Sequence, residues 1–210
     1  MIQVRDILVQ NCLVSNSYLE TIKSVDGEIF HIDYHQQRYE TVLSSFAIDS
    51  YISLKTYLNP PKNGLYRCRL VYSLDNSISV TYHKYKRREI KSLKLVFNDD
   101  IEYNLKSTNR DILDTLFQLR DECDESLIVQ NSLITDTTIA NIAFLKDGIW
   151  YTPKKPLLEG TTRARVLKEG KVVLKDISVD DIYSYEKVAL LNAMIDFDII
   201  AEKNIRKIVC

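Results

Sequence analysis

The feature that most constrains the fold is a series of short, β-rich segments filling the second half of the chain. Turn residues such as Asn131-Ser132 and Asp147-Gly148 separate them, and few stretches with helical spacing interrupt them. A sheet of many short strands can avoid open edges by curling toward closure, so we expect a closed or nearly closed sheet. The segments are residues 126–130, 133–134, 142–144, 149–152, 171–177 and 188–193.

The first half predicts an antiparallel sheet with helices, which is an α+β arrangement. Asp26-Gly27 is a hairpin turn signal, and Asp33 is a good N-cap for a helix. The expected strands are residues 17–25, 28–32, 64–72 and 77–82, and the expected helices are residues 34–46 and 48–58. Residues 1–10 have a mixed apolar pattern with weak helical or strand character.

The polar stretch 83–91 has no hydrophobic period, so we interpret it as a connector between two domains. We expect an α+β domain over residues 1–82 and a second domain over residues 92–210. The second domain is expected to open with a strand over residues 93–103, followed by a helix from about Thr108 to Cys123. Two short helices are expected further on, over residues 160–170 and 179–185.

Composition excludes several classes of function. The 210 residues carry 28 Lys and Arg against 29 Asp and Glu, which gives no electrostatic case for binding nucleic acid or an acidic membrane surface. No apolar run approaches the roughly 18–20 residues that span a bilayer, and the N-terminus lacks signal-peptide features, so we expect a cytoplasmic protein. The cysteines are scattered without nearby histidines, so we expect buried thiols and no metal site: Cys12, Cys68, Cys123 and Cys210.

Three segments of the second half carry polar residues that a buried structure does not need. Lys106 lies between the β-rich segment 93–103 and a helical pattern, and Asp136 is followed by hydroxyls and an amide. Gly160-Thr-Thr162 opens a helix whose free N–H groups would suit a phosphate. A lysine, a carboxylate and a phosphate site are together the components of a pyridoxal 5′-phosphate centre.

Each segment also has a purely structural interpretation. Lys106 could be a solvated surface charge, Asp136 could cap a turn, and Gly160-Thr-Thr162 could be an ordinary helix start. The residues alone leave both interpretations open.

Further stretches keep the order of motifs found in one enzyme family. They are Glu20-Thr-Ile with Val25-Asp-Gly27, Tyr34-His-Gln-Gln-Arg38, Leu105-Lys-Ser-Thr-Asn-Arg110, Ile134-Thr-Asp136 through Asn141-Ile142, Trp150-Tyr-Thr-Pro153 through Leu158-Glu-Gly-Thr-Thr-Arg163, and Leu190-Leu-Asn-Ala-Met194. As a set they resemble the class IV aminotransferases, the fold type IV pyridoxal-phosphate enzymes. That family includes branched-chain and D-amino acid aminotransferases and 4-amino-4-deoxychorismate lyase.

The resemblance implies an α+β enzyme with a small N-terminal α/β domain and a C-terminal pseudo-barrel domain. It implies that Lys106 bonds to pyridoxal 5′-phosphate and moves protons, that Asp136 pairs with the ring nitrogen, and that Arg38 binds the phosphate. The other implied cofactor contacts are Thr138, Asn141, Leu158, Gly160, Thr161 and Thr162. Candidates on the substrate side are Tyr18, Glu20, Arg69 and Asn192, and Arg67 shares a strand face with Arg69.

The chain departs from the family pattern in ways that bear on its reaction. Asp136 stands where the family usually has glutamate, so its carboxylate is one carbon shorter. The first domain is compact, and a trimmed enzyme needs no second substrate, so the expected reaction is that of 4-amino-4-deoxychorismate lyase, which releases pyruvate and 4-aminobenzoate for folate synthesis. The alternatives are an amino acid transaminase of branched-chain or D-amino acid type, and a non-catalytic pyridoxal-phosphate-binding or interaction protein. The resemblance also implies a homodimer.

Overall fold

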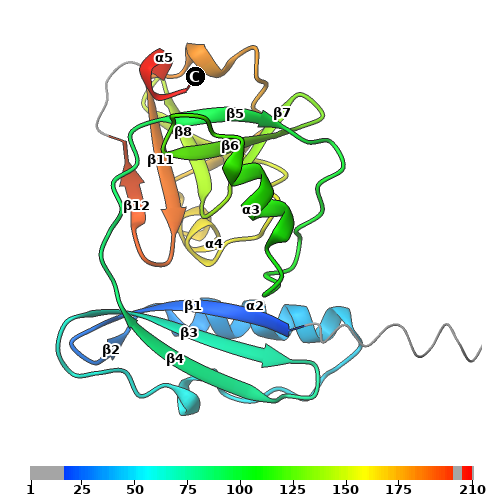
Figure 1. Ribbon diagram of the computed structural model, residues 1–210, viewed down its shortest axis with the longest axis vertical. Coiled ribbons are helices and arrows are strands. Elements are labelled where there is room, and N and C mark those ends of the chain that lie inside the picture. Colours follow the sequence, from blue (N-terminus) through cyan, green and yellow to red (C-terminus); the bar gives the residue numbers. More distant parts are fainter. Residues whose placement is uncertain (1–16, 201–204, 210) are drawn as a thin grey trace, which may run out of the picture.

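The protein consists of a small four-stranded sheet beside a larger eight-stranded sheet (Figure 1). The computed structural model describes residues 17–200 and 205–209. The chain builds the small sheet first and then passes through the segment between Lys84 and Leu93 into the larger one. The expected domain boundaries near this segment stay a prediction, and the weak pattern over residues 1–10 lies outside the described residues.

The small sheet is antiparallel throughout, in the order β2-β1-β3-β4. Asp26 and Gly27 both have positive φ, 49° and 87°, so the expected hairpin turn between β1 and β2 is confirmed. The elements of this part are β1 (Ser17–Val25), β2 (Glu28–Ile29), α2 (Ile32–Ser45), η1 (Leu54–Tyr57), β3 (Leu65–Ser73) and β4 (Ile78–Lys84).

Alternation along β1 and β3 divides the small sheet into two different faces. Even-numbered residues of these two strands pack against α2 and η1. Together with residues of α2 and η1 they form the core of this part, which comprises Tyr18, Ile22, Tyr39, Val42, Leu43, Leu54, Cys68, Leu70 and Tyr72. Odd-numbered residues such as Leu19, Thr21 and Arg69 line a cavity instead. One face of this sheet therefore holds α2, and the other is available to the second half of the chain.

The larger sheet runs β10-β9-β8-β7-β6-β5, with β11 and β12 attached at β8. β8 pairs with β11 along one edge and with β7 and β9 along the other, so the sheet branches and curls, in keeping with the nearly closed sheet expected. Its strands are β5 (Leu93–Phe97), β6 (Glu125–Gln130), β7 (Leu133–Thr137), β8 (Asn141–Lys146), β9 (Ile149–Pro153), β10 (Val173–Lys175), β11 (Lys187–Asn192) and β12 (Asp196–Ile199). Its helices are α3 (Asp111–Gln118), α4 (Thr161–Lys168), η2 (Ile182–Ser184) and α5 (Ile205–Ile208).

Both expected turns of the larger sheet are confirmed. Asn131-Ser132 and Asp147-Gly148 have positive φ and join β6 to β7 and β8 to β9. The strand expected over 93–103 is too long, because β5 ends at Phe97. Asn98 Oδ1 accepts the N–H of Asp100 there, and this local turn ends the strand.

Two of the expected helices are shorter than their apolar spacing predicted, and a third begins earlier than expected. Residues 48–58 form only the single turn η1, because the Gln36 side chain bonds the backbone of Ile52 and Leu54 and so takes the place of helical bonds. The helix expected over 108–123 is only α3, since the side chain of Asn109 accepts the N–H of Asp111 and sets the start there. α2 begins after His31, so Asp33 lies in its first turn and is not the N-cap.

Two further points complete the account of the described residues. The thiol of Cys68 is buried as expected, whereas Cys123 is only partly buried and Cys12 and Cys210 lie outside the described residues. Within residues 17–200 and 205–209, no helix is both long and apolar enough to cross a membrane.

Candidate active site

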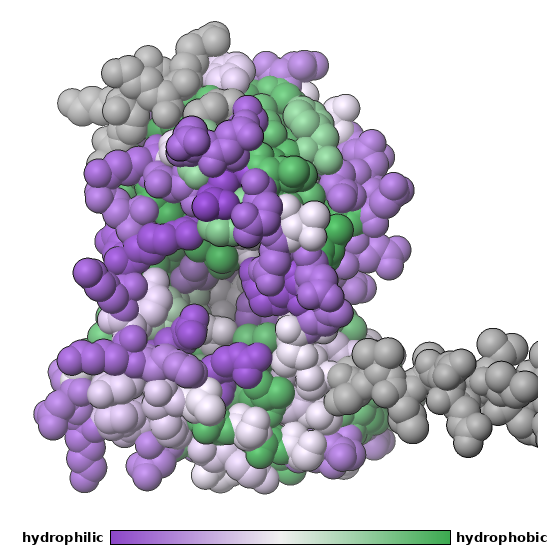
Figure 2. Space-filling view, in the orientation of Figure 1, coloured by the Kyte–Doolittle hydropathy of each residue, from purple (hydrophilic) through white to green (hydrophobic). Residues whose placement is uncertain are grey.

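A cavity of about 380 Å³ lies between the odd-numbered face of the small sheet and the mouth of the larger one. Figure 2 shows hydrophilic side chains around the recess where the two parts meet. A volume in this range accommodates a small cofactor or substrate. Its walls are Leu19, Thr21, Arg38, Arg67, Arg69, Tyr85, Tyr103, Lys106, Arg110, Leu113, residues 136–141, Leu157, Leu158, Gly160, Thr161 and residues 191–194.

Lys106 lies in the loop between β5 and α3, and its backbone is hydrogen-bonded to the small sheet. The carbonyl oxygen of Lys106 accepts the N–H of Leu19 at 2.9 Å, and Ser107 forms a β-bridge with Tyr18. The N–H of Thr108 donates to Ser17, also at 2.9 Å. The loop therefore pairs with the beginning of β1, along the edge of β1 that does not pair with β3. This pairing fixes where the Lys106 side chain enters the cavity.

The ammonium of Lys106 is destabilised in this position. Burial is the main cause, and the positive charges of Arg38 and Arg110 add to it, so the pKa falls from 10.5 to about 7. At pH 7 the neutral amine of Lys106 is therefore a major form, compared with about one in 3,000 for a lysine with an unshifted pKa. A neutral amine is the nucleophilic and basic form of lysine.

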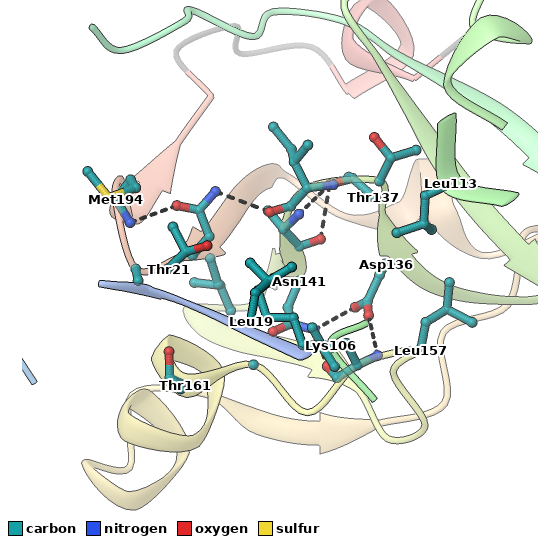
Figure 3. Close-up of a pocket in the computed structure, with 18 of the residues that line it drawn as sticks. Leu19, Thr21, Lys106, Leu113, Asp136, Thr137, Asn141, Leu157, Thr161 and Met194 are labelled. Carbon is teal, nitrogen blue, oxygen red and sulfur yellow. Dashed lines mark hydrogen bonds between the residues drawn. The ribbon is translucent and has the colours of Figure 1, made fainter. Parts of the chain in front are cut away.

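Asp136, near the end of β7, presents a buried carboxylate to the same cavity (Figure 3). The Asn141 side chain donates to its Oδ1 at 2.7 Å, and the N–H of Leu158 donates to its Oδ2 at 2.9 Å. Burial raises the pKa of Asp136 to about 7, although these two hydrogen bonds oppose the rise. A positively charged group in the cavity would stabilise the ionised form of this carboxyl group, which burial disfavours.

Asn141 connects the carboxylate to the segment that precedes α4. Besides Asp136, its Nδ2 donates to the carbonyl of Leu158 at 2.8 Å. A Cβ at Gly160 would lie only 1.9 Å from Asn141 Oδ1, so only glycine fits there. The close approach places Thr161, the first residue of α4, in the cavity wall, where free N–H groups and the helix dipole favour an anion.

Arg38 reaches the cavity from α2, held by a fully buried carboxylate. Its Nε donates to Glu20 Oε1 at 2.8 Å and its Nη2 to Oε2 at 2.5 Å, while His35 Nδ1 lies 2.6 Å from the same Oε2. Burial alone would raise the pKa of Glu20, but Arg38 and His35 outweigh it and hold the pKa at about 2. Arg38 Nη1, 3.5 Å from the Glu159 carbonyl, is left facing the α4 side of the cavity.

The structure brings most of the expected site residues together in one cavity wall. They are Arg38, Arg69, Lys106, Asp136, Thr138, Asn141, Leu158, Gly160, Thr161 and Asn192. Their roles stay predictions. Thr162, the residue after Thr161, is buried but does not line this cavity. It lines a much smaller pocket together with His31 and His35.

Two substrate-side residues are placed elsewhere. Tyr18 and Glu20 have even positions on β1, so Tyr18 packs in the core on the α2 side and Glu20 is paired with Arg38 and His35 behind the cavity. They are not in the wall. The strict alternation of a strand offered a signal for their neighbours, because Leu19 and Thr21 must face the opposite side.

Other wall residues were not singled out from the sequence. Arg110 donates to the Thr138 carbonyl at 2.9 Å and lines the cavity, although its motif was noted only for Lys106. Tyr103 donates to the Ser107 carbonyl at 2.9 Å beside it. Tyr85, in the segment between the two sheets, had no sequence signal as a wall residue.

Comparison with known proteins identifies the family. The Amino-transferase class IV profile matches residues 17–202. A protein of Haemophilus influenzae, described as an "uncharacterized protein", is 38% identical over an alignment of 181 residues, and the match covers 83% of this chain and 96% of that protein. The chain belongs to the class IV aminotransferase family.

Two solved structures place the fold within that family. A protein of Haemophilus somnus 129PT, described as "a putative 4-amino-4-deoxychorismate lyase", is 35% identical with a TM-score of 0.79, covering 87% of this chain and 98% of that one. The branched-chain amino acid aminotransferase of Escherichia coli has a TM-score of 0.67 at 16% identity, covering 90% of this chain and 76% of that one. The expected α+β fold type IV architecture, with a small N-terminal domain and a C-terminal pseudo-barrel, is confirmed, and the protein is an enzyme of this pyridoxal-phosphate-dependent class.

Proposed function

We propose that this enzyme binds pyridoxal 5′-phosphate in the cavity and acts as a 4-amino-4-deoxychorismate lyase, releasing pyruvate and 4-aminobenzoate. The observation that carries the proposal is that the amine of Lys106 and the carboxylate of Asp136, both with pKa values shifted to about 7, face one cavity beside the start of α4.

The described residues offer partners for the phosphate, the ring nitrogen and the aldehyde carbon of this cofactor. The close approach of Gly160 to Asn141 leaves room at the start of α4, where Thr161 and Arg38 Nη1 would hold a phosphate. Asp136 would accept the N–H of a protonated ring nitrogen, which supplies the positive partner that its burial calls for. Leu158 and Leu157 add apolar wall beside Asp136.

The chain's own residues would handle the proton of the reaction. Bound pyridoxal phosphate supplies an electron sink that acidifies the C–H bond beside the substrate's nitrogen. Lys106 Nζ would take that proton, because a base whose pKa lies near the working pH transfers protons best. As the six-membered ring of the substrate becomes aromatic, the bond between this ring and the enolpyruvyl oxygen breaks. The proton ends on the leaving enolpyruvate to give pyruvate. All atoms of the substrate are accounted for in the two products, so no water or oxidant is needed.

The lyase is favoured over a transaminase by similarity along nearly the whole chain. The Haemophilus somnus structure described as a lyase is 35% identical, whereas the Escherichia coli aminotransferase, at 16%, shares the fold alone. A lyase also matches the compact first domain, since it accepts no second substrate. Amino acid transamination at the same Lys106 remains the second candidate.

The cofactor part is tested on the purified protein with pyridoxal phosphate. We expect visible absorbance and, after borohydride reduction, a mass increase that peptide mapping assigns to Lys106. A Lys106→Ala variant is the control. Absence of any reducible cofactor at Lys106 in the wild type would refute the cofactor proposal.

The lyase part is tested by adding 4-amino-4-deoxychorismate to the loaded enzyme without a keto acid. We expect pyruvate and 4-aminobenzoate in equal amounts, with pyruvate followed by lactate dehydrogenase. If amino acids instead convert the cofactor to its amine form and no pyruvate appears, the enzyme is a transaminase.

We also propose that the enzyme is a cytoplasmic homodimer, as implied by its family resemblance. Light scattering of the purified protein tests the assembly, and a mass of 24.4 kDa, that of one chain, would contradict it.

A further inference from the structure

The cavity face of the small sheet carries a group of basic side chains around Arg67 and Arg69, and no ion pair within the described residues balances these two arginines. In the register of the sheet, Arg67 lies between Lys23 on β1 and His83 on β4. Arg69 lies between Thr21 and Thr81. Neither arginine forms an ion pair with any residue of the described ranges.

This arrangement does not serve stability. Like charges directly opposite each other on a sheet destabilise the pairing, and Lys23 and Arg67 are such a pair. An acid at Thr21 or Thr81 would have neutralised Arg69. Arg67 and Arg69, the members of this group that line the cavity, are therefore better explained by a negatively charged ligand than by the folding of the sheet.

The charges in the cavity wall lead to the same conclusion. The wall holds five cationic side chains, Arg38, Arg67, Arg69, Lys106 and Arg110, and one acidic side chain, Asp136. Arg38 is compensated by Glu20 and faces the α4 side, where the phosphate would bind. Lys106 is the reacting amine, and Arg110 is paired with Asp114 and donates to the Thr138 carbonyl. Arg67 and Arg69 are left for a second anion.

The strand register places this second anion away from Lys106. The backbone of Lys106 is bonded to Leu19, and the partners of Arg69 and Arg67 are two and four residues further along β1. A strand rises about 3.4 Å per residue, so the two arginines start about 7 and 14 Å from that point along the strand. Tyr85, whose side chain also lines the cavity, lies near Arg67.

We propose that Arg67 and Arg69 bind the ring carboxylate of a dicarboxylate substrate, while its amino-bearing carbon lies at Lys106. This rests on the proposed lyase function, in which the ring carboxylate is para to the reacting carbon and therefore distant from it. The pair makes the cavity selective for a cyclic acid with a carboxylate at its far end over small amino acids. Arginine suits the task because its planar donors bind a carboxylate bidentately.

The test measures binding of chorismate, which has both carboxylates but a hydroxyl in place of the reacting amine. Calorimetry with the cofactor-loaded enzyme should show affinity falling on the order of 10- to 100-fold in Arg69→Gln, and further in the double variant with Arg67→Gln. 4-Aminobenzoate, which keeps the ring carboxylate, should lose affinity in the same variants. Lys23→Gln is the matched control, since it removes a neighbouring charge of the same face that lies outside the cavity wall.

The outcomes separate this inference from the proposed function. If the arginine variants bind chorismate as the wild type does, or if Lys23→Gln weakens binding equally, the pair is only a solvated or general positive surface and the inference is wrong. If chorismate binding depends on the arginines although no pyruvate is formed from 4-amino-4-deoxychorismate, the carboxylate site stands and the lyase reaction fails. Borohydride labelling of Lys106 in every variant shows that the cofactor site is intact.

Discussion

Replacing Gly160 by alanine gives the sharpest test of how the site is built. The new Cβ would meet Asn141 Oδ1 at 1.9 Å, more than an ångström closer than real Cβ atoms approach a neighbour. The φ of Gly160 is −74°, so alanine meets no backbone strain and the clash is the whole effect. Either the segment before α4 moves away or the Asn141 amide leaves its position.

The cost can be worked out from the hydrogen bonds of that amide. Its Nδ2 donates to Asp136 at 2.7 Å and to the Leu158 carbonyl at 2.8 Å, and both acceptors are at least partly buried. Leaving a buried acceptor unsatisfied costs about 1–3 kcal/mol, so losing both bonds costs roughly 2–6 kcal/mol. For a chain of this size, that lowers the Tm by roughly 4–24 °C.

Thermal unfolding and cofactor titration measure the two consequences of Gly160→Ala. We expect the lower Tm together with weaker cofactor binding, because the start of α4 and the Asp136 carboxylate both lose their positions. In the background of Asn141→Ala, which removes the clashing oxygen, the same change at Gly160 should cost less than about 1 kcal/mol. A full cost in both backgrounds, or no cost in the wild type, would show that the Asn141 contact does not determine the residue at 160.

Three further predictions concern charge. Because the folded pKa of Lys106 is lowered to about 7, labelling of Lys106 by cofactor should rise about tenfold per pH unit up to pH 7 and then level off, whereas a rise continuing to pH 10 would contradict the lowered pKa. Glu20→Gln should lower the free energy of unfolding by about 3–5 kcal/mol and weaken cofactor binding, since it leaves the Arg38 charge buried without its partner. Urea unfolding measures this loss, and the control Glu28→Gln, at an exposed position, should change the free energy of unfolding by less than about 0.5 kcal/mol. Asp136→Asn should keep the fold but lower kcat at least tenfold, because an amide cannot stabilise a protonated ring nitrogen; unchanged kcat would remove Asp136 from the chemistry.

The parts of the site that sequence could predict are those whose signal is local. Lys106, Asp136 and Gly160-Thr-Thr162 each stand in a short motif beside an element boundary, and the structure places Lys106, Asp136, Gly160 and Thr161 in one wall. Tyr18 and Glu20 were expected on the substrate side but lie outside the cavity wall, because alternation shows that two faces exist but not which one meets the cavity. That choice depends on α2, whose His35 and Arg38 bind Glu20.

The errors in the fold have a similar physical origin. Residues 48–58 have helical spacing, yet the Gln36 side chain, distant in sequence, bonds their backbone and prevents a helix. β12 and α5 were not predicted, because these short segments acquire structure only through tertiary contacts. β12 pairs with β11, and α5 packs on the core. Turns fared better, since Asp-Gly and Asn-Ser determine their conformation within two residues.

The bonding of the Lys106 loop to β1 also has a consequence for how the protein folds. Ser17 and Thr108, which hold the two together, are 91 residues apart in the sequence. Contacts of such separation close a large loop of chain and form slowly compared with local hairpins. Refolding should therefore restore the secondary structure before the protein can capture its cofactor. The rate at which the bound cofactor's absorbance appears then measures the last step of folding, in which the two sheets pack together.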